Sequence, residues 1–219
     1  MRIAKYITVV IAAVVLAAGA GMAFAAWLIA PAVVAIGPPP RDFPAEQVAI
    51  SSSSGGTLAG WFARGQPGAG AVLLLHGVRA NRLSMLTRAQ FLHRHGYSVL
   101  LIDFQASGES PGRQITFGLL EAHDARAAFD ALKQRTPAER VGVIGVSMGG
   151  AAVLLSDPPI KADALVFEAV YATFEAATEN RLKLYLGPLG SWLLPAAMKQ
   201  VKPRLGVDPA LLRPIDRLD

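Results

Sequence analysis

The sequence contains no cysteine and few charged residues. Without cysteine the chain has no disulfide bond, no zinc site built on thiolates and no cysteine nucleophile. Charged residues make up 17% and hydrophobic residues 53%, which excludes intrinsic disorder. Lys and Arg number 21 against 16 for Asp and Glu; setting aside Arg2 and Lys5, the balance from Arg41 onward is 19 to 16, with no basic run. This scattered excess does not indicate a nucleic-acid partner.

A second absence lies near the N-terminus, where no charged side chain occurs between Lys5 and Arg41. The apolar stretch Tyr6–Ala30 would form a helix of roughly 37 Å, long enough to cross a hydrocarbon core of about 30 Å with some tilt. The residues Pro38-Pro39-Pro40 then form a stiff exit. We therefore expect residues 1–40 to be a membrane anchor or signal segment with a proline-rich exit, followed by one domain over residues 41–219.

Two other interpretations of this segment remain open. A cleaved signal peptide fits the basic start and the small-x-small triplet Ala23-Phe24-Ala25, although a signal peptide's apolar region usually has about 7–15 residues. A buried core helix would be apolar on one face rather than all round. We favour an uncleaved transmembrane helix. Arg2 and Lys5 precede it, so the positive-inside rule places the domain on the non-cytosolic, periplasmic or extracellular side. Cleavage would instead give a secreted protein.

After the prolines, short apolar runs alternate with helical stretches. Gln47–Ser51 and Thr57–Ala63 flank a Ser/Gly-rich turn and predict a strand pair. Further strands are predicted at Gly70–Leu75, Tyr97–Ile102, Val141–Ile144 and Ala164–Phe167, and helices at Leu83–His95, Phe117–Lys133 and Gly149–Leu155. Continuous apolar runs are typical of parallel strands that are buried on both faces. The order predicts an α/β fold with a mostly parallel sheet and helices on both faces.

The most specific motif is Gly145-Val146-Ser147-Met148-Gly149-Gly150, directly after the predicted strand at 141–144. Glycines let the chain turn sharply from strand to helix and lift the Ser147 hydroxyl above the sheet. The N–H groups at the start of the next helix then point toward any developing oxyanion. The alternative is a tight turn that carries an incidental serine.

Three pieces of the sequence together resemble the α/β-hydrolase superfamily, specifically its bacterial lysophospholipase-like and serine-aminopeptidase-like branch. They are residues 76–82 (HGVRANR), residues 103–110 (DFQASGES) and the motif at 145–150. The resemblance runs from about residue 45 to the C-terminus. The second piece departs from the commoner D-x-R-G-H-G-x-S form, because Gln105, Ala106 and Ser107 replace Arg, Gly and His. That loop shapes the rim of the pocket in the family, so the departure bears on substrate rather than on fold.

The resemblance implies a serine hydrolase with Ser147 as the nucleophile. The oxyanion hole would use the backbone N–H groups of Val78 and Met148. His76 and Asp103 would be structural, the first at a strand end and the second capping a loop. No metal or organic cofactor is implied.

An activated serine also needs a base, and in this fold an acid and then a histidine follow the nucleophile. No histidine follows Ser147; the four in the chain are His76, His93, His95 and His123. Glu168 could be an acid from a rarer arrangement, but we favour that it starts the cap segment or makes a salt bridge. The sequence ends at Asp219, before the strands that would carry the acid and the base in this family. We expect a fragment or truncated product; a pseudoenzyme, or a histidine from a partner chain, are the alternatives.

Residues 171–206 occupy the place where the family inserts a cap over the site. This segment is rich in apolar residues: Leu182, Leu184, Tyr185, Leu186, Leu189, Trp192, Leu193 and Leu194. They either cover an acyl chain or pack on the sheet. We predict hydrolysis of an acyl-ester or lipid-like substrate, with an amide or thioester less favoured, by a protein that meets the membrane through its N-terminal helix. The alternative is a non-catalytic, membrane-tethered binding protein. The sequence leaves the oligomeric state open.

Overall fold

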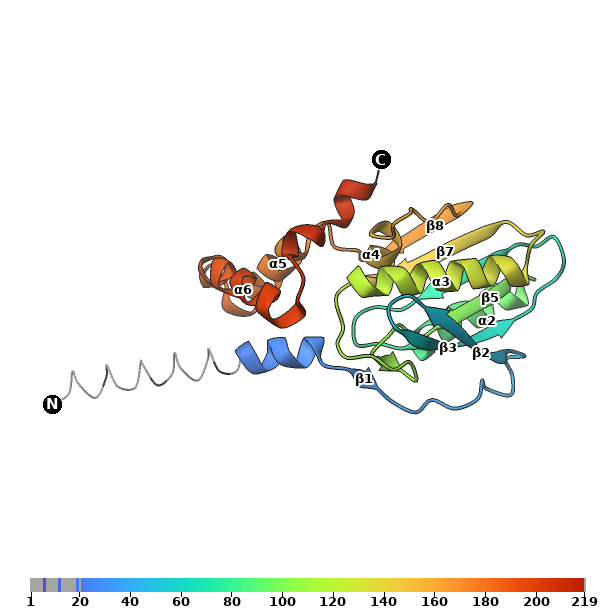
Figure 1. Cartoon of the computed structure of the whole chain (residues 1–219), viewed down its shortest axis with the longest axis horizontal. Coiled ribbons are helices and arrows are strands. Elements are labelled where there is room, and N and C mark those ends of the chain that lie inside the picture. The colour runs from blue at the N-terminus through green and yellow to red at the C-terminus, as the bar shows by residue number, and fades with distance from the viewer. Residues whose placement is uncertain (1–5, 7–11, 13–18, 20, 219) are drawn as a thin grey trace.

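The structure is a computed structural model that describes residues 6, 12, 19 and 21–218 (Figure 1). Its centre is a six-stranded sheet in the order β2-β3-β5-β4-β7-β8. The strands β5, β4, β7 and β8 are parallel to one another, while β2 and β3 are antiparallel to their neighbours. Their bounds are β2 Glu46–Ser52, β3 Gly56–Ala63, β4 Ala71–Leu75, β5 Ser98–Ile102, β7 Val141–Val146 and β8 Ala164–Glu168. The predicted α/β class with a mostly parallel sheet is confirmed.

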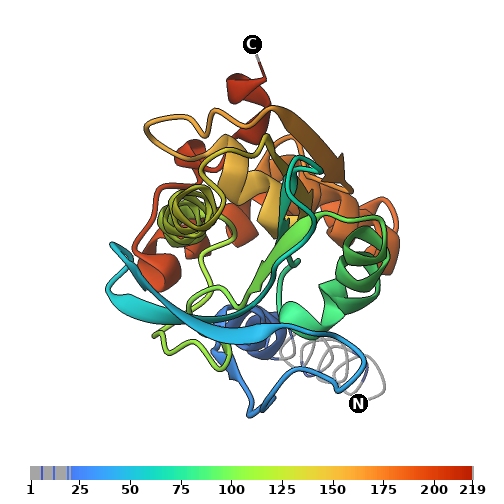
Figure 2. The same cartoon turned by 90° about the vertical axis from the view of Figure 1, so that its right-hand side faces the viewer.

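Helices cover both faces of this sheet (Figure 2). Helix α2 (Leu86–Arg94) lies on one face, while α3 (Leu119–Arg135) and α4 (Met148–Leu154) lie on the other. Two further helices, α5 (Phe174–Leu186) and α6 (Leu189–Leu205), form a hairpin beyond the end of the sheet (Figure 1). Short 3₁₀ turns occur at Arg82–Met85, Pro209–Leu211 and Pro214–Arg217.

The hydrophobic core has two main parts, one on each face of the sheet. In strand β4, Leu73 and Leu75 pack toward α3 and α4, whereas Val72 and Leu74 pack toward α2. Alternate side chains of one strand thus enter different clusters because successive residues point to opposite faces. This explains the continuous apolar runs in the sequence: a strand covered on both sides has no polar face.

The predicted strands are confirmed to within two residues at their ends, and so are two of the helices. The third predicted helix, at residues 83–95, begins differently, with a 3₁₀ turn at Arg82–Met85 before α2. Asn81 caps this turn by accepting a hydrogen bond from the Leu83 N–H at 3.0 Å. The side chain of an N-cap asparagine satisfies an otherwise free N–H, so the chain can turn before the regular helix starts.

Strand β8 corrects the expectation that every parallel strand is buried on both faces. Leu165 is 42% exposed and Val166 is 48% exposed. Within the described residues β8 pairs only with β7, so it forms an edge of the sheet. The apolar run at 164–167 therefore predicted the strand correctly and its burial wrongly.

The segment before residue 41 is attached to the rest of the fold. Residues 21–29 are helical, and the Ile115 N–H donates to the Ile29 carbonyl at 2.8 Å. The following short strand β1 (Ala32–Val33) pairs in parallel with β6 (Ser107–Gly108). The segment between the helix and the proline-rich exit is thus bound to the domain through β1.

The predicted transmembrane helix over Tyr6–Ala30 lies largely outside the described residues. Among those described, no helix has the length and apolar character that a bilayer crossing requires.

The cap-like segment is a helical hairpin whose apolar side chains do not pack on the sheet. Six of the eight apolar residues named for residues 171–206 are exposed, and Trp192 reaches 85%. Within the described residues, the hairpin is anchored through the start of α5 and the second half of α6. There Phe174, Val201 and Leu205 join a third apolar cluster with Leu212 and the Ile29 side chain.

Glycines allow α4 to lie directly against the sheet. A Cβ atom added at Gly145 would lie 2.6 Å from the Cα of Gly150, and one added at Gly149 would lie 2.5 Å from the Leu75 carbonyl oxygen. Both distances are far below van der Waals contact, and both neighbours are backbone atoms that cannot rotate away. The glycine spacing of the motif is therefore a packing requirement at the crossing of β4, β7 and α4.

This packing predicts different costs for two alanine substitutions in strand β7. Gly145→Ala should lower the free energy of unfolding by about 1–3 kcal/mol, because the backbone must move. Gly142→Ala is the matched control, since its added Cβ would lie 3.6 Å from the Ala164 carbonyl oxygen. Its effect should stay within about 0.5 kcal/mol. Urea unfolding followed by circular dichroism measures both, and equal losses would contradict the packing argument.

Candidate active site

Ser147 is the single residue between the end of strand β7 and the start of helix α4. Its backbone has φ 51° and ψ −113°, in the left-handed half of conformational space that non-glycine residues rarely occupy. Such conformations cost about 1–3 kcal/mol and are kept where the surroundings enforce them. Here the Ser147 N–H donates to the Glu168 carbonyl at 2.8 Å, and the Ser147 carbonyl accepts from the Ala151 N–H at 3.1 Å. The turn is thus held from β8 and from α4.

The loop after β4 lies beside this serine. A Cβ atom added at Gly77 would be 3.5 Å from the Ser147 Cβ, so the loop backbone runs directly past the serine side chain. Val78 follows in the loop, and Met148 is the first residue of α4. In the described part of the chain, neither the Val78 nor the Met148 N–H donates a hydrogen bond. Met148 directly follows Ser147 and Val78 directly follows Gly77, and the N–H groups of these two predicted oxyanion donors have no acceptor among those residues.

His76 is fully buried at the end of β4 and serves the loop structure. Its Nε2 accepts a hydrogen bond from the Phe104 N–H at 3.0 Å. Its Nδ1 lies 2.8 Å from the Gly77 carbonyl oxygen. Since Nε2 must be unprotonated to accept, Nδ1 carries the hydrogen and the ring is neutral. Burial lowers the pKa of His76, in agreement with this neutral form. The predicted structural role of His76 is confirmed.

The other three histidines are engaged elsewhere. His93 and His95 lie at the C-terminal end of α2, with His95 Nδ1 2.8 Å from the Phe91 carbonyl oxygen. His123 lies on α3, with Nδ1 3.2 Å from the Ser53 Oγ. Within the described residues, no histidine forms a hydrogen bond with Ser147.

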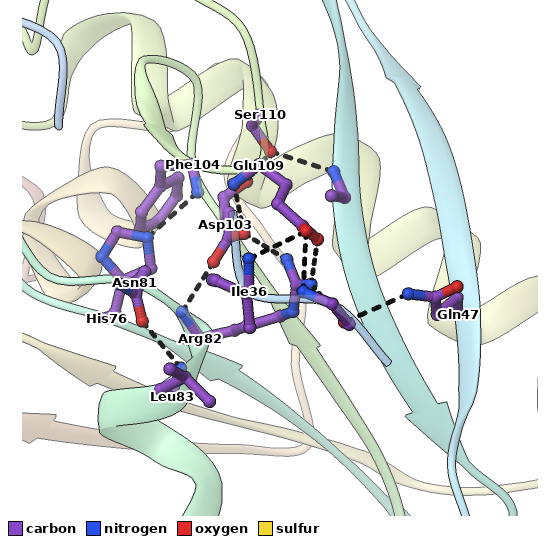
Figure 3. A network of polar contacts seen from close by, with 12 residues as sticks. Ile36, Gln47, His76, Asn81, Arg82, Leu83, Asp103, Phe104, Glu109 and Ser110 are labelled. Carbon is purple, nitrogen blue, oxygen red and sulfur yellow. Dashed lines mark hydrogen bonds and ion pairs between the residues drawn. The ribbon is translucent and has the colours of Figure 1, made fainter. Parts of the chain in front are cut away.

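A buried ion pair joins the loops that border the site (Figure 3). The Arg82 guanidinium binds the Asp103 carboxylate, and the Arg82 N–H donates to the same carboxylate at 2.7 Å. Arg82 and Asp103 are both buried, and the Trp61 ring lies 4.6 Å from the guanidinium carbon. The predicted loop-capping role of Asp103 is confirmed, whereas no pattern in the sequence pointed to Arg82 as its partner.

Glu109 extends this network to the N-terminal segment. Its carboxylate binds Arg82 and accepts the N–H groups of Ile36 and Gly37 at 2.9 and 2.8 Å. The hydrogen bond from Arg82, with those from the two N–H groups, lowers the pKa of Glu109 to about 2. Figure 3 shows Arg82 between the carboxylates of Asp103 and Glu109. Arg82, together with Glu109, therefore connects the loop after β4, the loop after β5 and the N-terminal segment at residues 36–37.

The comparisons with known proteins agree with this geometry. Residues 66–212 match the family model described as "Serine aminopeptidase, S33". The chain belongs to this family. It therefore belongs to the α/β-hydrolase superfamily, and the resemblance found in the sequence is confirmed.

Two curated relatives illustrate the relationship. YqkD of Bacillus subtilis is 28% identical over 178 residues, which are 78% of this chain and 57% of that protein. Rv2307c of Mycobacterium tuberculosis is 37% identical over 108 residues, 48% of this chain and 38% of that protein. The chain thus spans about half or less of the length of these relatives.

Among solved structures, the Pyrococcus furiosus esterase Pf2001 is 28% identical, with a TM-score of 0.58, covering 84% of this chain and 68% of that chain. The α/β serine hydrolase XC6422 of Xanthomonas campestris, a member without a lid, is 18% identical with a TM-score of 0.52, covering 63% and 65%. At that identity the second match shows the fold alone.

In this family member the unusual loop at residues 103–110 is buried rather than exposed at a rim. Ala106 has φ 57°, so an alanine takes a left-handed conformation where the commoner pattern has glycine. The Gln105 amide donates to the Gln114 carbonyl at 2.6 Å and to the Glu121 carboxylate at 3.0 Å. Ser107 pairs with Ala32 of β1. The residues Gln105, Ala106 and Ser107 thus face the protein interior and the N-terminal segment.

Glu168 forms a salt bridge, which was one of the roles predicted for it. Its carboxylate binds the guanidinium of Arg88 on α2, with 3.1 Å between Nε and Oε1. Both side chains are partly exposed, at 42% for Arg88 and 38% for Glu168. An exposed ion pair of this kind contributes about 0–1 kcal/mol to stability.

Two arginines of the chain provide a matched test of the buried network. Arg82→Ala leaves the buried Asp103 carboxylate without its cation and should cost about 3–5 kcal/mol of unfolding free energy. Arg88→Ala breaks the exposed pair with Glu168 and should cost about 0–1 kcal/mol. Urea unfolding of the two variants beside the parent measures the difference. Similar losses would contradict the assignment of Arg82 as the central cation.

The low pKa of Glu109 predicts a specific dependence of stability on pH. Because its pKa is lower in the folded state than the ordinary value of about 4.3, Glu109 adds stability above that value. This contribution is lost as the pH falls from about 4.3 toward 2. Glu109→Gln should therefore lose less unfolding free energy than the parent between about pH 5 and pH 2.5. Urea unfolding across this range checks it, and parallel curves for the two proteins would refute it.

Proposed function

We propose that this chain carries the nucleophile and oxyanion hole of a serine hydrolase that cleaves an ester through an acyl-enzyme on Ser147. The observation that carries the proposal is the strained position of Ser147 between β7 and α4, with the loop of Gly77 beside it. Strain of this kind is retained at functional sites because the structure around it enforces it.

In the proposed reaction the Ser147 Oγ forms a bond to the carbonyl carbon of the ester while a base takes its proton. The carbonyl oxygen becomes an oxyanion and accepts the Val78 and Met148 N–H groups. Backbone donors of this type each lower the barrier by about 2.7–4 kcal/mol. The alcohol then leaves with a proton, and water hydrolyses the acyl-enzyme and restores Ser147.

This reaction requires a base that none of the four histidines supplies. His76 is held by Phe104 and Gly77, and His93, His95 and His123 lie on α2 and α3. The proposal therefore requires a base other than these four histidines.

The substrate proposed is an ester with an acyl or lipid-like group, ahead of an amide or a thioester. The similar protein Pf2001, at 28% identity to this chain, is an esterase. The apolar hairpin of α5 and α6 also suits an apolar substrate. We further propose that the apolar N-terminal segment anchors the protein in a membrane, with the domain on the non-cytosolic side; a secreted form after cleavage is the alternative.

A fluorophosphonate probe tests the nucleophile directly, because it phosphonylates activated serines. The protein in its own membrane should be labelled, Ser147→Ala should lose at least nine-tenths of the label, and the exposed control Ser84→Ala should keep it. Labelling of Ser147→Ala at the parent level would refute the proposal.

The intact mass of the extracted protein, measured together with probe labelling, distinguishes the hydrolase from a non-catalytic binding protein. A folded protein whose mass equals these 219 residues, and which takes up no probe, is a membrane-tethered binding protein rather than an enzyme. A larger mass together with labelling of Ser147 supports the hydrolase.

A further inference from the structure

The turn between α5 and α6 is an exposed apolar tip. Residues 184–194 (LYLGPLGSWLL) contain no charged side chain. The exposed fractions are 75% for Leu184, 69% for Tyr185, 70% for Leu189 and 85% for Trp192. Contiguous apolar surfaces of this kind on a folded protein mark sites of interaction with a partner or a membrane.

This tip lies at the same end of the molecule as the N-terminal helix. Arg204, near the end of α6, donates to the Met22 carbonyl at 3.1 Å, and the Ile29 side chain packs against the cluster of Val201 and Leu205. In Figure 1 the hairpin and the helix at 21–29 both project away from the sheet, and the hairpin extends at least as far as the first residues of that helix. The helix is itself apolar and exposed there, with Phe24 at 45% and Trp27 at 52%.

Charges on the hairpin are arranged behind the tip and are mostly positive. Residues 174–206 contain five cationic side chains against two anionic ones, Glu175 and Glu179. The cations are Arg181, Lys183, Lys199, Lys202 and Arg204, none of which falls within residues 184–198. We call these five cations the basic collar. An apolar tip with such a collar fits an anionic bilayer, because apolar side chains enter the boundary between head groups and acyl chains while the long Lys and Arg side chains reach the anionic head groups.

The aromatic residues agree with the same surface. Trp and Tyr favour the boundary between water and lipid, where an apolar ring and a polar group are both satisfied. Trp192 and Tyr185 are on the hairpin, and Trp27 is on the neighbouring helix.

From these observations we infer that the tip of the α5–α6 hairpin, Leu184–Leu194, is a membrane-contact surface that inserts into the outer part of an anionic bilayer beside the N-terminal helix. Together the helix and the hairpin give the domain two points of contact with the lipid. They hold the loops around Ser147 near the membrane surface. The tip binds lipid in this way whether or not Ser147 reacts.

The lack of cysteine in these 219 residues makes the test simple, because a single introduced cysteine is then their one site for a thiol label. Leu189→Cys carries the environment-sensitive dye NBD at the tip, and Leu184→Cys is a second tip variant in case the first does not fold. Ala138→Cys is the matched control: residue 138 is exposed and precedes β7, at the edge of the sheet opposite to Ser147. Each full-length variant is reconstituted into vesicles of phosphatidylcholine and phosphatidylglycerol, with and without doxyl-labelled lipid.

We expect a blue-shifted NBD emission at the tip positions and at least twofold quenching by doxyl lipid, with no quenching at position 138. Quenching should weaken when phosphatidylglycerol is omitted. Tip positions quenched no more than position 138 would overturn the inference. So would a blue shift without doxyl quenching together with cross-linking between the cysteines of two chains, because a second copy then covers the tip. Equal quenching in neutral and anionic vesicles would overturn the role of the basic collar.

Discussion

The geometry of the site depends on one buried ion pair, between Arg82 and Asp103. Removing two charges from water costs several kcal/mol per ion, and the pair is tolerated only because each charge finds further partners. Asp103 accepts the Arg82 and Glu109 N–H groups at 2.7 and 2.9 Å, and Arg82 also binds the Glu109 carboxylate. The loop after β4, which carries Val78, is thereby fixed against the loop after β5. Space is also tight there, since a Cβ atom at Gly108 would lie 2.2 Å from the Asp103 carboxylate carbon.

Most of the local structure and the strand-to-helix turn at Ser147 could be predicted from the sequence, because runs of apolar residues and turn-forming glycines act over a few positions. The motif around Ser147 is an example: its glycines are required by contacts with backbone atoms of β4 and α4. Burial was harder. The apolar run at 164–167 and the apolar tip at 184–194 have the composition of buried segments, yet both are exposed in large part. Apolar composition shows that side chains favour burial, but it does not show which other part of the structure covers them.

The partners of buried charges were also beyond sequence analysis. Arg82 and Asp103 are 21 residues apart, and Ile36 and Glu109 are 73 apart, so their contacts follow from the topology of the sheet. Asp103 alone was expected to cap a loop, which is the local part of its role. The attachment of residues 32–33 to 107–108 as a parallel pair had no local signal either, since two residues carry too little pattern. The family resemblance supplied the order of the elements but not these contacts.

The edge position of β8 has a consequence for the dynamics of Ser147. Strands β4 and β5 have neighbours on both sides and buried side chains, so their amide hydrogens exchange only when the core opens. In the described part of the chain β8 is bonded on one side, and its exposed apolar residues hold it weakly. Yet the Ser147 N–H is bonded to the Glu168 carbonyl, on the last residue of β8. Fraying of this edge releases one of the two backbone restraints on the serine turn, so the conformational order of Ser147 depends on how firmly β8 is held against β7.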